Sequence, residues 1–141
     1  MVQITHFEPD TQLIESLVWS GFGGGLVTAA IAMAQRIVPG FDPYRVKPHV
    51  TINHWNIRVY LHGEPALAPF DEVALGAVDN RILALSIGLA KLHWSYLHPL
   101  VVRGTRFGAI GFHSDAITPE QQTAMRSFAG KAEDALERIW E

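Results

Sequence analysis

Aromatic and histidine side chains are the groups in this 141-residue chain best suited to binding chemistry. Trp94, Tyr96 and His98 alternate along a segment with a strand-like pattern, so they share one face of the expected strand. An indole N–H, a phenol and an imidazole need hydrogen-bond partners when they are buried. Small-molecule sites are mostly apolar pockets with a few such polar groups. We therefore predict that this face lines a ligand pocket. The alternative, that these rings are core residues, stays open.

The central segment of the chain is expected to close this pocket. Residues 41–55 form an irregular stretch with prolines and scattered aromatic and histidine residues. Loops and short helices fill the space over a sheet less tightly than straight elements do. The pocket should therefore form where the sheet meets this segment. The candidate binding residues from this region are Tyr44, His54, Trp55 and Arg58.

The sequence lacks the patterns that catalysis and metal binding use. It has no cysteine, which excludes disulfides, thiol catalysis, thiolate ligands and thioether-linked cofactors. His93 and His98 are five residues apart on a strand and so point to opposite faces. The glycines of residues 21–25 lack the spacing of a phosphate loop, and no Gly-x-Ser-x-Gly elbow or carboxylate pair occurs. We expect neither catalytic turnover nor a metal site.

Composition indicates one soluble domain. The chain is 48% hydrophobic and 18% charged, enough apolar surface to build a core. Its net charge of −3, without a Lys/Arg cluster, argues against nucleic acid and anionic membranes as partners. The start lacks signal-peptide features, and the longest apolar stretch, Leu26–Ala34, is too short to span a bilayer. We expect a single cytoplasmic domain over residues 1–141.

The first half of the chain predicts a hairpin and several helices. Val2–Phe7 and Gln12–Trp19 are rich in β-formers and flank a turn, so they should pair. Leu26–Ile37 is apolar on nearly every side, which is typical of a buried helix. The weaker elements are a short helix at Asn56–His62, a strand at Ala66–Ala68 and a helical pattern at Leu75–Ala90, in which Asp79 suits the cap of a shorter helix.

The second half carries clearer signals. A strand from Lys91 to Val102, interrupted at Pro99, should form a hairpin with Arg106–His113 through a Gly104 turn. Thr118, Pro119 and Gln121 then form a helix start with a capping box. Apolar residues recur on one face of this helix, namely Met125, Phe128, Ala129, Ala132, Ala135, Leu136 and Ile139. That face should pack on the strand face that carries Ser95 and Leu97.

The motifs of the second half resemble those of a GAF domain. The matching pieces, in order, are Leu97-His98-Pro99-Leu100-Val101-Val102, the Arg103-Gly104-Thr105 turn, Phe107-Gly108-Ala109-Ile110-Gly111-Phe112 and Thr118-Pro119-Glu120-Gln121. Leu61–Leu67 is similar to the "helix, Gly-x-Pro, strand" passage midway through such domains. The resemblance implies an α+β fold, a central antiparallel β-sheet with helices on both faces (GAF/PAS-like). It also adds His113 to the candidate site, because phytochrome-like GAF domains carry a chromophore-facing histidine at that strand end.

Departures from the GAF pattern limit the classes of ligand that this domain is expected to bind. The Asn-Lys-x-Phe-Asp-Glu signature of the cyclic-nucleotide branch is absent, and the methionine sulfoxide reductase and covalent bilin branches both need cysteine. The identity of any cofactor is left unknown, with non-covalent haem or another tetrapyrrole, held by a histidine, as a disfavoured alternative. The helix that usually precedes the first strand is missing, so we expect a domain excised from a longer signalling protein.

The resemblance implies a regulatory sensor domain of a signalling protein such as a histidine kinase. It would bind a small, flat or aromatic ligand between the sheet and the central segment, and pass the signal through its terminal helix. Ile139 and Trp140 overrun the expected sheet edge, so we expect a homodimer through the terminal helices. The alternative is a ligand-free dimerisation or interaction module.

Overall fold

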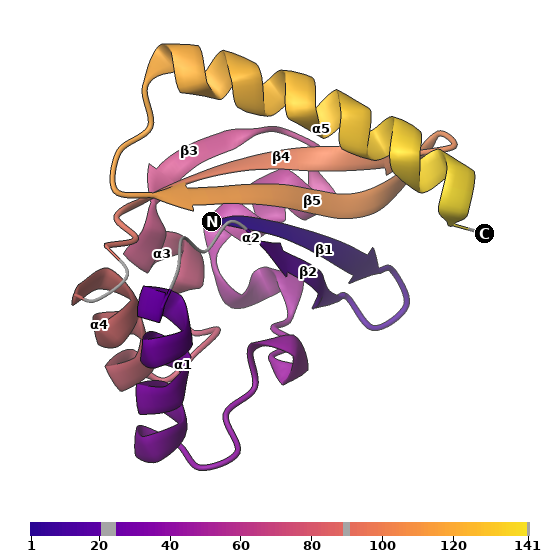
Figure 1. Cartoon of the computed structure of the whole chain (residues 1–141). Helices are drawn as coiled ribbons and strands as arrows, with labels where there is room; N and C mark the ends of the chain where they lie inside the picture. The colour runs from indigo at the N-terminus through magenta and orange to yellow at the C-terminus, as the bar shows by residue number, and fades with distance from the viewer. Residues whose placement is uncertain (21–24, 89–90, 141) are drawn as a thin grey trace.

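A five-stranded antiparallel sheet with helices on both faces forms this α+β protein, as expected (Figure 1). The computed structural model describes residues 1–20, 25–88 and 91–140, with the backbone alone for residues 25–30 and 85. The strand order is β2-β1-β5-β4-β3. The strands are β1 (Val2–Glu8), β2 (Leu13–Ser20), β3 (Ala66–Pro69), β4 (Trp94–Val102) and β5 (Thr105–Ser114). None of the described helices combines the length and apolar character needed to cross a bilayer.

Helices of very different length cover the two faces of the sheet. The long α5 (Pro119–Ile139) lies across one face, and the remaining helices lie on the other side (Figure 1). These are α1 (Gly25–Ile37), η1 (Pro43–Arg45), η2 (Val50–Ile52), α2 (His54–Asn56), η3 (Ile57–Leu61), α3 (Phe70–Ala74) and α4 (Asn80–Gly88). Helices shorter than α5 and their connecting loops therefore form the described part of the second layer.

Both predicted hairpins are present. β1 pairs with β2, and β4 pairs with β5, in antiparallel register. The β4–β5 turn has positive φ at Arg103 (52°) and Gly104 (77°), the backbone that a two-residue hairpin loop requires. Pro99 does not interrupt β4. Its position is tolerated because β3 pairs with β4 only from Trp94 to Leu97, which leaves Pro99 on an edge of the ladder.

The helical predictions for the first half are confirmed in position but not in every detail. The Leu75–Ala90 pattern yields the shorter α4, where Asp79 Oδ1 accepts a hydrogen bond from the Arg81 backbone N–H at 2.8 Å. Helix α1 is less buried than expected, since Met33 is 44% exposed while Ala34 is buried. The reason is that α1 packs along α4 and stands away from the sheet (Figure 1). The glycine segment 21–24 lies outside the described residues.

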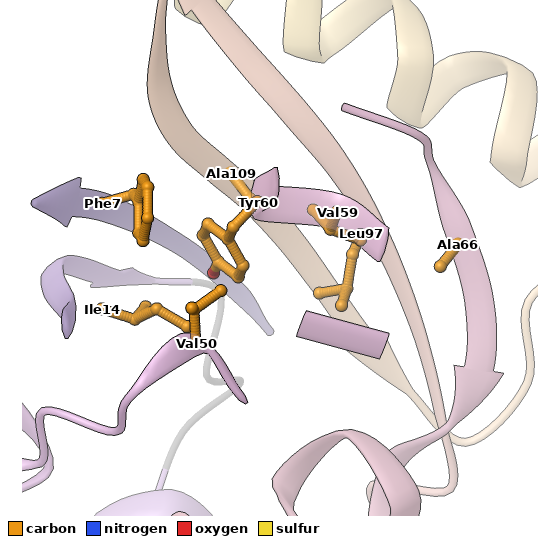
Figure 2. Packing of buried hydrophobic residues seen from close by; sticks show 8 residues of the cluster. All are labelled: Phe7, Ile14, Val50, Val59, Tyr60, Ala66, Leu97 and Ala109. Carbon is orange, nitrogen blue, oxygen red and sulfur yellow. The ribbon is translucent and has the colours of Figure 1, made fainter. Parts of the chain in front are cut away.

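Two hydrophobic clusters stabilise the fold, one on each face of the sheet. The cluster on the face opposite α5 consists of Phe7, Ile14, Val50, Val59, Tyr60, Ala66, Leu97 and Ala109 (Figure 2). The cluster beneath α5 consists of Tyr96, Leu100, Val102, Phe107, Ile110, Phe112, Ala129 and Leu136. Gly108 lets β1 and β5 approach, because a Cβ there would lie 2.0 Å from the Thr5 carbonyl oxygen.

Helix α5 begins with the predicted capping box. Thr118 Oγ1 accepts from the Gln121 backbone N–H at 3.1 Å, and Gln121 Oε1 accepts from the Thr118 N–H at 2.8 Å. Ala129 and Leu136, seven residues apart, form the buried line of the helix. Phe128 is 51% exposed and contacts the Phe112 ring of the sheet edge-on at 6.0 Å, so it lies at the border of the core and not within it, as the prediction had it. Its position lies one residue off the buried line.

This packing predicts unequal losses of stability along α5. Leu136→Ala should lower the free energy of unfolding by about 2–5 kcal/mol, because it opens a cavity in the core. Phe128→Ala should cost clearly less, about 1 kcal/mol, because half of the ring is already in water. Urea denaturation of both variants measures the difference. Equal losses would mean that α5 packs on its Phe128 line instead.

Candidate functional site

A cavity of about 390 Å³ lies on the sheet face opposite α5. It is bordered by the sheet, the central segment, α1 and α4, which is where the sequence places a pocket. Its volume is within the range of small-molecule sites. Its lining residues are Met1, Gln3, Thr5, Ile14, Ser16, Trp19, Ile31, Ala34, Phe41, Pro43, Tyr44, Val46, Pro48, Asn56, Tyr60, Phe70, Val73, Ala74, Ala77, Val78, Ile82, Ser86, Leu92, Leu97 and His113.

The walls contributed by the helices and loops are mostly apolar. Helix α1 supplies Ile31 and Ala34, and α4 supplies Ile82. Aromatic rings come from several elements, among them Trp19 of β2 and Phe70 at the start of α3. Such a wall offers flat rings and small aliphatic groups for contact, which suits a flat apolar ligand body.

The sheet forms a polar floor to this cavity. Ser95 Oγ lies 2.6 Å from His113 Nδ1, His113 Nε2 lies 3.2 Å from Gln3 Oε1, and Gln3 Nε2 donates to Ser16 Oγ at 2.7 Å. We call these four residues the polar relay. Since Gln3 Oε1 can only accept, His113 donates from Nε2, and its neutral ring accepts at Nδ1 from the Ser95 hydroxyl. The hydrogen bonds therefore all run in one direction, from β4 to β2.

His113 is held in its neutral form. It is 3% exposed, and burial lowers its pKa to about 3, with a smaller contribution from the N-terminal ammonium. Its ring packs edge-on against Phe70 at 5.3 Å between centroids. Gly111 makes room for the ring, because a Cβ there would lie 3.0 Å from His113 Nε2. The residue thus serves as a fixed hydrogen-bond bridge and not as a proton carrier at neutral pH.

A hydrogen-bonded pair, Thr5 and Tyr60, lies beside the polar relay. Thr5 Oγ1 donates to the Ala109 carbonyl oxygen at 3.1 Å and lies 2.7 Å from the Tyr60 hydroxyl, so that hydroxyl is the donor between them. Burial raises the pKa of Tyr60 to about 12, although the Thr5 hydrogen bond works in the opposite direction. Tyr60 is therefore a neutral phenol whose oxygen keeps its lone pairs.

The predicted Trp94, Tyr96 and His98 face does not line the cavity. These residues do share one face of β4, but Tyr96 is buried beneath α5 and Trp94 is 41% exposed. The expectation rested on polar tips left without partners under the helix. That argument is wrong because Arg126 of α5 donates from Nε to the Tyr96 hydroxyl at 3.0 Å, and that hydroxyl lies 3.0 Å from His98 Nδ1. The opposite face supplies Leu97 to the cavity wall, and Ser95 on that face is hydrogen-bonded to the lining residue His113.

The remaining candidates divide by position. Tyr44 and His113 line the cavity, as predicted. The other three, His54, Trp55 and Arg58, are absent from its wall. The Trp55 indole donates to Glu72 at 3.2 Å, and Arg58 forms an ion pair with Glu64 at 3.5 Å.

Helical spacing explains why these three residues are turned away. Asn56 and Tyr60, four residues apart, occupy the face of α2 and η3 that meets the cavity. His54, Trp55 and Arg58 each lie one or two positions from Asn56, about 100–200° around the helix, and therefore point elsewhere. The sequence did carry a signal for the sheet residues that were missed: Gln3 and Thr5 alternate as polar residues on a strand whose other residues are mostly apolar.

The site is poorly suited to a metal or haem. Among residues 1–20, 25–88 and 91–140, no group of three or more His, Cys, Asp or Glu side chains could hold a metal ion. Both ring nitrogens of His113 have partners on the protein, so an axial bond to haem iron would break one of them. The residues at the cavity do not fit that alternative.

The lowered pKa of His113 predicts acid sensitivity. In the unfolded chain this imidazole binds a proton below about pH 6.5, whereas in the folded chain it stays neutral down to about pH 3. Stability should therefore fall as pH drops through this window, by up to about 1.4 kcal/mol per pH unit from this residue. His113→Gln should flatten the dependence measured by urea denaturation, and His54→Gln, at an exposed site, is the control. Parallel curves for His113→Gln and the parent would show that His113 is not held neutral.

Comparisons with known proteins address the fold. No protein-family model matches the chain, and curated proteins gave no significant match. Among solved structures, the chain is similar to "the domain of putative two-component sensor histidine kinase protein from Sinorhizobium meliloti 1021". The two are 15% identical with a TM-score of 0.50, and the match covers 98% of this chain and 78% of that one. Such a likeness concerns the fold alone, and membership of the GAF family is not shown. The chain is therefore an α+β domain whose antiparallel sheet and two helical layers are compatible with a GAF- or PAS-like fold.

Proposed function

We propose that this chain is a cytoplasmic regulatory sensor domain of the GAF-like type, without catalytic turnover. It binds a small, flat or aromatic ligand in the cavity and relays that event through α5. The observation that carries the proposal is the cavity itself, because apolar walls above a hydrogen-bonded polar floor are the usual composition of a small-molecule site. A shared fold with a domain of a sensor histidine kinase supports a role in signalling, as an analogy of fold.

The proposed transmission of the signal from the cavity to α5 follows from the sheet being a single layer. Successive residues of β5 point to opposite faces: His113 lies at the cavity, and its neighbour Phe112 lies under α5. The Phe112 ring contacts Phe128 of α5 at 6.0 Å and Tyr96 at 6.4 Å. A ligand that displaces β5 therefore also displaces the surface on which α5 rests, and packed interfaces respond by shifting between discrete arrangements.

A variant in which a larger side chain fills the cavity tests this function. Ala34→Phe places a ring in the cavity from α1 and should weaken ligand binding about tenfold or more, because the ring occupies the ligand's space. Ala32→Phe, on the exposed side of the same helix, is the matched control and should bind as the parent does. Native mass spectrometry of the purified protein, followed by calorimetric titration with planar aromatic compounds, provides the measurement. The sensor proposal fails if neither method finds a ligand, or if both variants bind equally.

A second candidate function, dimerisation, has its own supporting observation. Apolar side chains remain exposed along α5 and the adjacent edge strand, namely Val18 (46%), Phe128 (51%), Ile139 (75%) and Trp140 (38%). Trp140 packs edge-on against Phe107 at 4.9 Å, which fixes the end of the helix beside the sheet. Contiguous exposed apolar groups of this kind favour a protein–protein contact, and a homodimer through α5 would cover them.

Sedimentation equilibrium tests the dimer. The parent protein should sediment as a dimer at micromolar concentration, and Ile139→Glu should weaken association about tenfold or more, because it places a carboxylate in an apolar contact. Gln122→Glu, which adds the same charge near the opposite end of α5, is the control. A monomeric parent protein would remove this candidate and leave the ligand proposal standing.

A further inference from the structure

The cavity wall contains no charged side chain among the described residues. Its lining holds no Asp, Glu, Lys or Arg, and its one histidine is kept neutral by burial. The undescribed segments 21–24 and 89–90 read Gly-Phe-Gly-Gly and Leu-Ala, so neither contains a charged side chain. The α-amino group of Met1 also lies at the wall, where it donates to the His113 carbonyl oxygen at 3.0 Å. Burial lowers its pKa, which favours the uncharged amine.

Charged groups near the cavity are turned outward. Arg58 and Glu64 pair at 3.5 Å with about half of each side chain in water, and Lys47 pairs with Glu15 at 3.6 Å in the same way. A charged ligand entering the cavity would lose its hydration without meeting a side chain of opposite charge. Burial of an unpaired charge is strongly unfavourable. The wall therefore discriminates against both anions and cations.

Ser16 and Tyr60 offer a donor and an acceptor beside each other at the polar floor. Ser16 accepts from Gln3 Nε2 and keeps its own hydroxyl proton, which forms no hydrogen bond within the described part of the chain. The Tyr60 hydroxyl gives its proton to Thr5 and keeps its lone pairs. Ser16 and Thr5 are direct partners in the β1–β2 register, so the two groups lie near each other on the floor.

We propose that the cavity selects an uncharged ligand with a flat apolar body, one hydrogen-bond acceptor for the Ser16 hydroxyl and one donor for the Tyr60 oxygen. This inference rests on the proposed function, since it names the class of ligand for the same cavity. An aromatic alcohol or a neutral aromatic amide has these properties. Carboxylates, phosphates and ammonium compounds of the same shape are rejected.

Three probes of similar shape test the charge selection: 2-naphthol, 2-naphthoate and 2-naphthylmethylammonium. Each is titrated into the full chain by calorimetry at neutral pH. We expect 2-naphthol to bind about tenfold or more tightly than either ion, because no side chain of the wall offers a counter-charge. Ser86→Lys, which adds an ammonium at the wall from α4, should reverse the order of 2-naphthol and 2-naphthoate. Ala84→Lys, on the exposed side of α4, should leave the order unchanged.

A second pair of variants tests the donor on the floor. Ser16→Ala should weaken 2-naphthol binding several-fold, whereas Ser20→Ala, on an exposed position of the same strand, should not. Thermal melts confirm that each variant is folded. Equal binding of all three probes, blocked by Ala34→Phe, would overturn the charge inference and leave the sensor proposal intact. If none of the probes binds and Ala34→Phe changes nothing, the proposed function fails and the inference with it.

Discussion

Burial of β5 on both faces is the constraint on which the other features depend. Residues 107–113 are buried without interruption, so the strand cannot face water on either side. A strand of this kind needs a cover above and below the sheet. Helix α5 provides one cover with a straight, close-packed line through Ala129 and Leu136. The other cover is assembled from loops and from helices shorter than α5, and a cavity remains between this cover and the sheet.

The two faces handle their buried polar groups in different ways. Beneath α5, Arg126 reaches in from the helix and donates to the Tyr96 hydroxyl, so helix and sheet are joined by a hydrogen bond as well as by apolar contact. On the cavity side the hydrogen bonds run within the sheet, through Ser95, His113 and Gln3. A buried polar group without a partner is costly, and the relay removes that cost without any charge. The cavity floor is thereby polar and neutral at once.

In the proposed function, the same arrangement couples ligand binding to signal output. A ligand bound by the hydroxyl groups of Ser16 on β2 and Tyr60 on η3 would contact the sheet directly, and α5 packs on the other face of that single sheet. Small shifts of strands in a tightly packed core are carried to whatever packs on the other side. The exposed apolar residues on α5 then provide a surface on which such a shift could alter association.

The sequence by itself determined the local elements: the two hairpins, the Arg103-Gly104 turn and the capping box of α5, because each depends on residues close together in the chain. It also placed a pocket between sheet and central segment. Only the tertiary structure decided which face of β4 meets the cavity. Alternation along the strand puts Tyr96 and Ser95 on opposite faces, but it does not determine which face α5 covers. Helix α5 can pack on the Tyr96 face because Arg126 of the helix donates a hydrogen bond to the buried Tyr96 hydroxyl. The polar relay could not be predicted from the sequence for a similar reason. Gln3 and His113 are 110 residues apart, and only the strand order brings them together.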